Sequence, residues 1–533
     1  MKSFGGCLGA LSAATTLAFG LGFAAQPASA QKTLTIIPHA DLRVLDPLQA
    51  AATITTMHAT NIYDQLFAWD VDLQPKPQMV GNYSVSPDKL VYTMTLRPGL
   101  KWHDGTAVTT KDVIASVNRW MKRDPIGRKM GESVAEMTAT DANTFVIKMK
   151  TPYAWVEYSL GNHAGNFPAI MREKEAMTDP FTAVSNDAQI GSGPFKFVAS
   201  EWKPGSEVVY VKNPDYVPRS EPPDAMAGGK MAKVDRLVFK VIPDANTAAN
   251  ALLKGEVDMI DMPAGDILPL LEKDKDIVVQ KVHPVGGFGF FRPNGLHPPF
   301  NNIKARQALA LIASQEDFLA AGFGDKKWWN TCFSYYVCKS AYGTEAGSEP
   351  YRKPDIARAK QLLAEAGYKG EKIYVIGTKE IAHIGAITEV LVDGLRKAGV
   401  NVELEMMDWG TMVTRFGGNK NVPGVQGGWH LWSASGSWST WHNPLTNLGT
   451  NMSTDSSWAG WAADEEAEKL RNAFIAAGTK DERMAVLDKL HKRLWEVVPY
   501  VMTGQYDQPY AWRKNVSGVL PTSKLVLFNI AKQ

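Results

Sequence analysis

The feature that most constrains this fold is an alternation of short β-like runs with amphipathic helical runs, with no flexible Gly/Ser linker between them. Such alternation is typical of α/β proteins, in which helices cover the faces of sheets. The clearest unit is a strand–helix–strand pattern over residues 372–406, whose helix spans 383–398 and ends before Gly399. A parallel pair of strands joined by a crossover helix is expected there.

The same patterns predict further elements along the chain. Strands are expected over residues 33–37, 90–96, 144–149 and 195–199. Helices are expected over residues 111–122, 244–254, 355–366, 464–477 and 481–497. The segment 201–229 is rich in Pro and Gly and is expected to run over the surface. A chain of 533 residues is too long for a single core, so two or three lobes joined by short, ordered crossovers are expected.

The N-terminus has the pattern of a secretory signal peptide. Lys2 carries the only charge in the first 30 residues, the middle of this stretch is apolar, and it ends in Ala28-Ser29-Ala30. The apolar part is shorter than the roughly 20 residues that cross a membrane. Cys7 precedes the apolar run, so a lipid anchor is not expected. The pattern predicts export to the periplasm with cleavage after Ala30.

Two cysteines remain beyond the signal, Cys332 and Cys338. An even number of cysteines in an exported chain favours a disulfide, which here would close a small loop and stabilise the fold by about 2–3 kcal/mol. A metal pair or a redox couple is the alternative. Neither has a Cys-x-x-Cys spacing or a neighbouring His to support it.

Charge and motifs argue against several classes of function. The net charge of +2 gives no electrostatic reason to expect nucleic acid as a partner. Residues 31–533 contain no Gly-x-Ser-x-Gly, P-loop or His-Glu-x-x-His motif. His430 and His442 lack further metal ligands nearby in sequence, and Asp258 with Asp261 is a weak candidate for glycosidase chemistry. No catalytic residue, metal or cofactor is predicted, and an exported hydrolase is the alternative class.

A set of local motifs runs through the chain in a recognisable order. They are residues 45–47 (LDP), 62–67 (IYDQLF), 96–106 (LRPGLKWHDGT), 110–113 (TKDV), 190–195 (IGSGPF), 213–216 (NPDY), 298–302 (PPFNN), 305–309 (ARQAL) and 362–368 (LLAEAGY). Together they resemble the periplasmic binding proteins for dipeptides, oligopeptides, nickel and opines, which are family 5 of the ABC-transporter solute-binding proteins. The turn around His103 is expected to be scaffold in this pattern, because Asp and Gly supply its tight geometry.

The resemblance implies a two-lobed periplasmic-binding-protein (Venus-flytrap) fold of the α/β class, with mixed sheets flanked by helices and a ligand cleft between the lobes. Lobe I would comprise residues 31–285 with an inserted subdomain, lobe II residues 286–504, and residues 505–533 would return to lobe I. Crossovers would lie near 285–291 and 501–508. The chain would be a monomer that captures a small molecule by hinge closure and delivers it to an ABC permease at the inner membrane. A chaperone or adhesin that reuses the fold is a further alternative.

The segment 427–447 (GGWHLWSASGSWSTWHNPLTN) is the main candidate for contact with a ligand. Its aromatic, hydroxyl and amide side chains suit a cyclic, sugar-like, opine-like, aromatic or quaternary-ammonium solute. The candidates are Trp429, Trp432, Ser433, Ser435, Trp438, Trp441, His442 and Asn443. The alternative for the tryptophans is a place in the core.

Asn443 stands where peptide-binding members of the family have an aspartate that pairs with the ammonium group of the peptide. An amide cannot neutralise a desolvated ammonium, so ordinary dipeptides and oligopeptides become the second choice of solute. Arg292 and Lys379 are cationic candidates, although Arg292 equally suits a structural ion pair. His39 and Asp41 follow the first strand, where family members bring a loop to the pocket.

Overall fold

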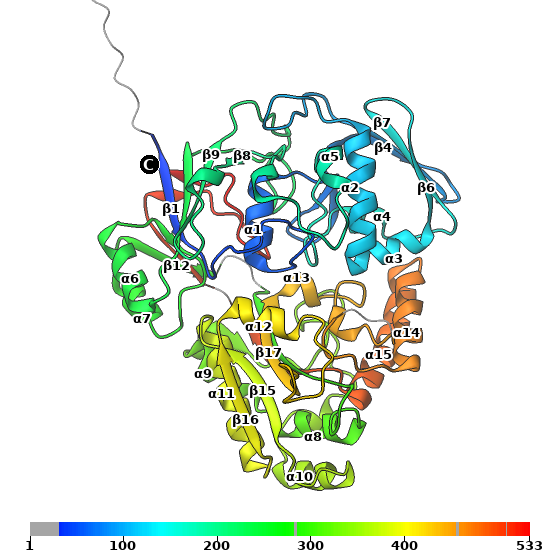
Figure 1. Cartoon of the computed structure of the whole chain (residues 1–533), viewed down its shortest axis with the longest axis vertical. Coiled ribbons are helices and arrows are strands. Elements are labelled where there is room, and N and C mark those ends of the chain that lie inside the picture. Colours follow the sequence, from blue (N-terminus) through cyan, green and yellow to red (C-terminus); the bar gives the residue numbers. More distant parts are fainter. Residues whose placement is uncertain (1–30, 282–284, 455–457, 508) are drawn as a thin grey trace, which may run out of the picture. The chain divides into compact units, whose positions relative to one another are not determined.

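The computed structural model describes residues 31–281, 285–454, 458–507 and 509–533. The predicted signal peptide, residues 1–30, lies outside the described residues. Residues Lys32–Gln533 form one compact α/β unit that contains three sheets of four or more strands and two short two-stranded ones. In Figure 1 most helices lie beside these sheets, as the alternation in the sequence predicts.

The first large sheet has seven strands and draws on both ends of the chain. In spatial order they are β12 (Ile277–Lys281), β19 (Pro509–Arg513), β11 (Met259–Ile260), β1 (Thr33–Ile37), β10 (Arg236–Lys240), β9 (Glu207–Lys212) and β8 (Phe195–Phe197). β1 runs parallel to both of its neighbours, whereas β9 and β19 run antiparallel to theirs. The sheet is mixed, and strands β1 and β8 start at the residues expected from the sequence.

A four-stranded antiparallel sheet is inserted in the chain between β1 and β8. Its order is β4 (Val80–Val85), β5 (Val91–Leu96), β7 (Thr144–Met149) and β6 (Val134–Ala139). β5 and β7 confirm two expected strands. Inward residues such as Met94, Phe145 and Ile147 are buried and alternate with more exposed ones, as one face of an antiparallel sheet requires.

The second large sheet has six strands. In order they are β14 (Trp329–Asn330), β18 (Val501–Tyr506), β13 (Gly287–Pro293), β17 (Leu431–Ser437), β15 (Ile373–Thr378) and β16 (Val402–Met407). β15 and β16 are parallel and are joined by the helix α11 (Ala382–Lys397), which contacts both strands. This is the strand–helix–strand unit expected from residues 372–406. The short sheets pair β2 (Phe67–Trp69) with β3 (Pro75–Pro77) and β20 (Val516–Ser517) with β21 (Ala531–Lys532).

The α-helices of the described residues are α1 (Thr53–Ile62), α2 (Thr110–Arg123), α3 (Pro125–Ser133), α4 (Val156–Leu160), α5 (Glu173–Ala176), α6 (Ala245–Lys254), α7 (Leu268–Lys273), α8 (Ile303–Ile312), α9 (Gln315–Phe323), α10 (Ile356–Glu365), α12 (Trp409–Phe416), α13 (Trp438–Trp441), α14 (Glu465–Ala476) and α15 (Lys480–Val497), besides α11. Six of these α-helices, α2, α6, α10, α11, α14 and α15, confirm expected ranges within one residue at each end, and the remaining α-helices were not expected from the sequence. α2 begins with a capping box of Thr109 and Asp112, and α6 ends at the left-handed Gly255.

The chain passes between the two large sheets at two neighbouring places. β12 and β19 pair with each other in the seven-stranded sheet, and the strands that adjoin them in sequence, β13 and β18, pair with each other in the six-stranded sheet. The two passages are therefore short and start from paired strands on both sides.

Three of the sequence motifs meet at one packing point. The backbone N–H of Gly191 donates to Nδ1 of His103 (3.2 Å), and Nε2 of His103 bonds to the carbonyl oxygen of Gly193 (3.2 Å). A Cβ on Gly191 would lie 1.6 Å from the carbonyl oxygen of Ile62 at the end of α1. Burial lowers the pKa of His103 to about 4, which keeps this ring neutral. His103 is scaffold, as expected.

Two further expectations have definite outcomes. The disulfide between Cys332 and Cys338 is present. The expectation that residues 201–229 run over the surface is wrong in part: β9 lies inside the seven-stranded sheet, and Ala225, Met226 and Ala227 are buried. Directly after this segment, the ammonium group of Lys230 forms a buried ion pair with Asp64 (2.7 Å), which holds the chain here in the interior.

Candidate ligand-binding cavity

Two adjoining cavities lie in the compact unit. The inner cavity has a volume of about 380 Å³ and the outer cavity about 700 Å³. Their shared walls include His39, Asp261, Ile381 and Tyr506, so the two spaces meet around these side chains. Both volumes fall in or near the range of small-molecule sites, roughly 300–1,000 Å³.

One side of the inner cavity, named here the aromatic wall, consists of six side chains from β13, β17, α12, α13 and a nearby loop. They are Phe290, Trp409, Phe416, Trp432, Trp441 and Trp458. The rings support one another: Phe416 stacks on Trp432 with centroids 4.0 Å apart, and Phe290 contacts Trp441 at 4.7 Å. Mutual packing of this kind fixes the rings in place and presents flat apolar surface to a ligand.

A second group of lining side chains, named here the polar wall, comes from α1, the end of α2 and two loops. Its members are Thr53, Arg123, Asn166, Ser523 and Lys524. Asn166 donates to the carbonyl oxygens of Pro47 (3.3 Å) and Leu48 (2.9 Å), and Ser523 bonds to Nε2 of His163 (2.8 Å). These contacts tie the polar wall to neighbouring loops.

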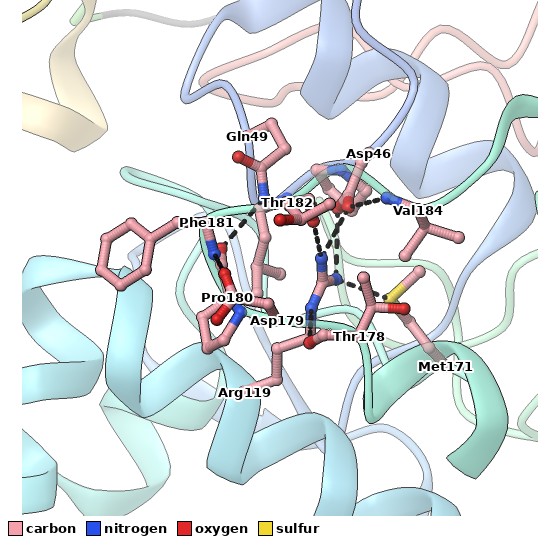
Figure 2. A network of polar contacts seen from close by, with 12 residues as sticks. Asp46, Gln49, Arg119, Met171, Thr178, Asp179, Pro180, Phe181, Thr182 and Val184 are labelled. Atoms are coloured by element: carbon pink, nitrogen blue, oxygen red, sulfur yellow. Dashed lines mark hydrogen bonds and ion pairs between the residues drawn. The ribbon is translucent and has the colours of Figure 1, made fainter.

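A buried ion pair supports the edge of the polar wall (Figure 2). Arg119 on α2 donates to Asp46 (2.8 Å) and to the carbonyl oxygens of Thr178 and Thr182. Gln49, which lines the inner cavity, donates to the carbonyl oxygens of Pro180 (3.0 Å) and Thr182 (3.3 Å) in the same loop. The loop is therefore tied to both α2 and the cavity edge.

A His–Asp pair stands where the two cavities meet. Nδ1 of His39 lies 2.5 Å from Oδ2 of Asp261, and the backbone N–H of His39 also points to that oxygen (3.4 Å). Asp261 is the only carboxylate that lines the inner cavity among the described residues. Its oxygen Oδ2 is already occupied by His39, which reduces what it offers to a ligand.

The structure brings six of the twelve predicted ligand-binding residues to the cavities. Trp432, Ser435, Trp441 and His39 line the inner cavity, and His39, Asp41 and Lys379 line the outer one. The hydroxyl of Ser435 bonds to Nε2 of His383 (2.7 Å). Lys379 is largely exposed and pairs with Glu389 (3.4 Å). Their contact with a ligand remains a prediction.

The structure places four other predicted residues in the core, away from both cavities. Trp429 is fully buried and packs against Trp461, and Trp438 packs edge-on against His442. Ser433 is buried and bonds to Thr388.

Arg292 is the fourth residue in the core. Burial lowers its pKa to about 9. It donates to the carbonyl oxygen of Gly449 (3.0 Å) and lies 4.1 Å from the ring of Trp458, so it supports the aromatic wall from behind.

His442 and Asn443 lie in a hydrogen-bonded cluster with Tyr158 of α4, which also lies outside the walls of both cavities. Nδ1 of His442 donates to the carbonyl oxygen of Ser439 (2.8 Å), so Nε2 accepts from the hydroxyl of Tyr158 (2.7 Å). The amide nitrogen of Asn443 donates to the same hydroxyl (3.0 Å). A carboxylate at position 443 would place a second acceptor against Nε2, so this cluster explains the amide in physical terms.

The sequence reasoning missed several cavity residues. Trp409 and Phe416 lie on α12, which directly follows the carboxyl end of β16, and Trp458 lies in a loop. Ligands in α/β folds bind outside the carboxyl ends of strands, so the position after β16 was a usable signal for Trp409. No local pattern marks Arg123 or Lys524, because the fold brings them together from distant segments.

Comparison with known proteins decides the family. The model of the bacterial extracellular solute-binding proteins, family 5 (middle), matches residues 74–457. The chain belongs to this family. It is a solute-binding protein of an ABC transporter, and members of the family are periplasmic. No helix among residues 31–281, 285–454, 458–507 and 509–533 has the length and apolar character to cross a membrane.

Individual relatives cover nearly the whole chain. A probable peptide ABC transporter periplasmic-binding protein, y4tO of Sinorhizobium fredii, is 39% identical over 496 residues, which is 92% of each chain. The glutathione-binding protein GsiB of Pectobacterium atrosepticum is 25% identical over 484 residues, 90% of this chain and 89% of its own. Both relatives are binding proteins.

Solved structures show the same two-lobed fold. The periplasmic binding protein AgaA of A. tumefaciens R10, in complex with agropinic acid, has a TM-score of 0.79 at 22% identity, with 94% of this chain and 99% of that chain covered. A dipeptide-binding protein of Pseudoalteromonas in complex with Met-Leu also has a TM-score of 0.79, at 19% identity, with 94% and 100% covered. The neighbours bind unlike solutes, so the fold does not fix the ligand.

Proposed function

We propose that this chain is the exported solute-capturing subunit of an ABC importer and that it encloses a small, ring-bearing or sugar-like solute in the inner cavity. The observation that carries the proposal is the aromatic wall, in which stacked rings line a cavity of about 380 Å³. Stacked rings bind flat or cyclic groups by apolar contact, and the polar wall supplies hydrogen bonds and charge.

The proposal assigns the two large sheets to two lobes. Lobe I would comprise residues 31–285 and 505–533, and lobe II residues 286–504. In support, the polar wall comes from residues 53–166 and 523–524, whereas the aromatic wall comes from residues 290–458. A solute that contacts both walls would favour the closed form, which the permease would recognise.

Export completes the proposal. Residues 1–30 would be removed after Ala30, and the mature chain would work as a monomer in the periplasm. The oxidised Cys332–Cys338 pair supports this compartment, because disulfides persist in oxidising environments.

Ordinary peptides are the second candidate, favoured by the probable peptide-transport role of the relative from Sinorhizobium fredii. A peptide needs a carboxylate for its ammonium group, and Asp261 is the one that the inner cavity offers within the described residues. Because His39 already bonds to Asp261, a solute without an ammonium group fits the cavity better.

A thermal-shift screen of the mature chain, residues 31–533, tests the proposal. The solutes are peptides, opines, sugars, aromatic acids and betaines. A solute at 100 times its dissociation constant adds about 2.7 kcal/mol to the free energy of unfolding, which raises the melting temperature measurably. Non-peptide hits support the proposal. Hits among ordinary peptides alone would contradict the proposed solute class but not the transport role.

A further inference from the structure

The polar wall contains an ammonium group for which the described residues supply no counter-ion. Lys524 is 3% exposed and lines the inner cavity. Its Nζ donates to the carbonyl oxygen of His163 (2.6 Å) and to the hydroxyl of Thr56 (3.2 Å), both neutral acceptors. Among the described residues it forms no ion pair. Burial lowers the pKa of Lys524 to about 7, because a charged ammonium group is unfavourable where water is excluded.

Arg123 is a second cation on the same wall, and it forms no ion pair within the described part of the chain. Its Nε is buried with no hydrogen-bond acceptor in the part of the chain that the structure describes, and its guanidinium group lies 5.6 Å from the ring of Phe181. The neighbouring carboxylate of Asp124 is used elsewhere, because it accepts the backbone N–H groups of Ile126, Gly127 and Asn166 (2.9 Å each).

The two cations border one short segment of chain. Lys524 bonds to the carbonyl oxygen of His163, and the backbone N–H of Asn166 bonds to Asp124, the residue next to Arg123. Ala164 and Asn166 of this segment line the cavity themselves. The positive charge is therefore concentrated on one wall.

The N-terminus of α1 adds to this charge. Residues 50–54 line the inner cavity, and α1 begins there without a side-chain cap. The first N–H groups of a helix have no partner within it, and the helix dipole makes this end partly positive. The N-terminus of α1 supplements the two cations and would not form a site without them.

We propose that the solute carries a carboxylate and that this group binds on the polar wall between Lys524, Arg123 and the first turn of α1. The inference rests on the proposed function and adds the chemical class of the solute. Among the described side chains that line the inner cavity, two cations against the single carboxylate of Asp261 leave one positive charge, which matches a monoanion better than a phosphate. The rest of the solute then lies against the aromatic wall, where low polarity strengthens the ionic contact.

The test compares acids with their amides on the mature wild-type chain. The probes are indole-3-acetate and indole-3-acetamide, glucuronate and glucuronamide, Met-Leu and its C-terminal amide, and glucose 1-phosphate as the phosphate. The readout is the melting temperature at fixed ionic strength, followed by titration calorimetry of any solute that raises it. At least one acid is expected to raise the melting temperature while its amide does not.

Variants of the two cations test whether selective binding of the acid depends on them. Lys524→Gln is expected to weaken binding of that acid by about 30-fold or more, because removal of one partner of a buried charge pair has an effect of this size. Arg123→Gln is expected to weaken it less, since Arg123 is only half-buried. Lys122→Gln removes an exposed charge from the next position of α2 and serves as the matched control, with binding unchanged. If Lys524→Gln does not fold, Lys524→Arg and Arg123→Gln carry the test, and Lys524→Arg is expected to retain acid selectivity.

The outcomes separate this inference from the proposed function. Equal response to acids and amides, a preference for glucose 1-phosphate, or acid binding that is unchanged in Lys524→Gln and Arg123→Gln would overturn the inference and leave solute capture standing. No response to any solute in this set or in the wider screen would count against both.

Discussion

The two walls of the inner cavity are built by different means. The aromatic wall is held by contacts between its own rings, with Phe416 against Trp432 and Arg292 behind Trp458. The polar wall is held by hydrogen bonds to backbone atoms of neighbouring loops, as at Asn166 and Gln49. The first therefore depends on packing volume, and the second depends on the partners of each polar atom. A substitution on either wall should show which kind of support it removed.

The largest effect is expected from the aromatic wall. Trp432→Ala should lower the free energy of unfolding by about 3–5 kcal/mol, because Trp432 is 2% exposed and its removal leaves a large void. It should also abolish the melting-temperature shift caused by a bound solute. Denaturant titration and the thermal-shift assay measure the two effects.

Trp429→Ala is the matched control, since Trp429 is equally buried but lies outside both cavities. Stability should fall by a similar amount, whereas the solute-induced shift should remain. Loss of that shift in both variants would contradict the distinction between core and cavity tryptophans.

The next largest effect on stability is expected from the buried ion pair of Arg119 and Asp46, which supports the polar wall. Arg119→Met should lower the free energy of unfolding by about 3 kcal/mol, at the lower end for a broken buried ion pair, because Asp46 keeps the N–H groups of Leu48 and Val184 as donors. Arg358→Met removes an arginine from an exposed ion pair with Glu365 and should cost less than about 1 kcal/mol. Denaturant titration compares the two, and equal losses would contradict the assigned role of Arg119.

The cluster of Tyr158, His442 and Asn443 predicts a response to pH. Burial lowers the pKa of His442 to about 4, below its usual 6.5, so the unfolded chain binds this proton more readily. This contribution to stability is present above pH 6.5 and is lost as the pH falls from 6.5 to 4, by at most about 1.4 kcal/mol per pH unit. Denaturant titrations at pH 7.5 and 5.0 should show a smaller pH effect in His442→Gln than in wild type, and equal effects would refute the assignment.

The smallest effect is expected at the hydroxyl group of the same cluster. Tyr158→Phe removes the donor to His442 and the acceptor for Asn443. The free energy of unfolding should fall by about 1–3 kcal/mol if these buried partners are left unsatisfied. The loss should be near the lower figure if the amide of Asn443 bonds directly to His442 instead. Tyr374→Phe, at a hydroxyl without a hydrogen bond among the described residues, should change stability little. Chemical denaturation distinguishes the two variants.

Local sequence patterns predicted the elements well and the cavity only in part. Caps and periodicity determine features such as the start of α2 at Thr109 and the β15–α11–β16 unit, because both depend on residues close in sequence. The Trp-rich segment was found as a candidate, but its tryptophans divide between cavity and core. Which side each ring faces depends on packing against α12 and on residues 458–461, which are distant in sequence.

The polar wall shows the same limit more strongly. Lys524 and Arg123 lie about 400 positions apart in the chain and reach one wall only through the arrangement of α1, α2 and the C-terminal loop. Their significance depends on the fact that no described carboxylate forms an ion pair with either of them, which no local pattern records. The sequence analysis pointed to Lys379 and Arg292 as the cationic candidates and named neither Lys524 nor Arg123.

The packing of Gly191 and Gly193 against the end of α1 bears on how genomes are searched for such proteins. Any side chain at Gly191 would collide with the backbone of Ile62, so the position is restricted by the scaffold and not by the cargo. A search pattern built on residues 190–195 will therefore retrieve transporters of unlike nutrients together. Separating these proteins by the solute that they carry requires a comparison of the residues on the two walls. Substitutions there can change the solute without a change in the scaffold.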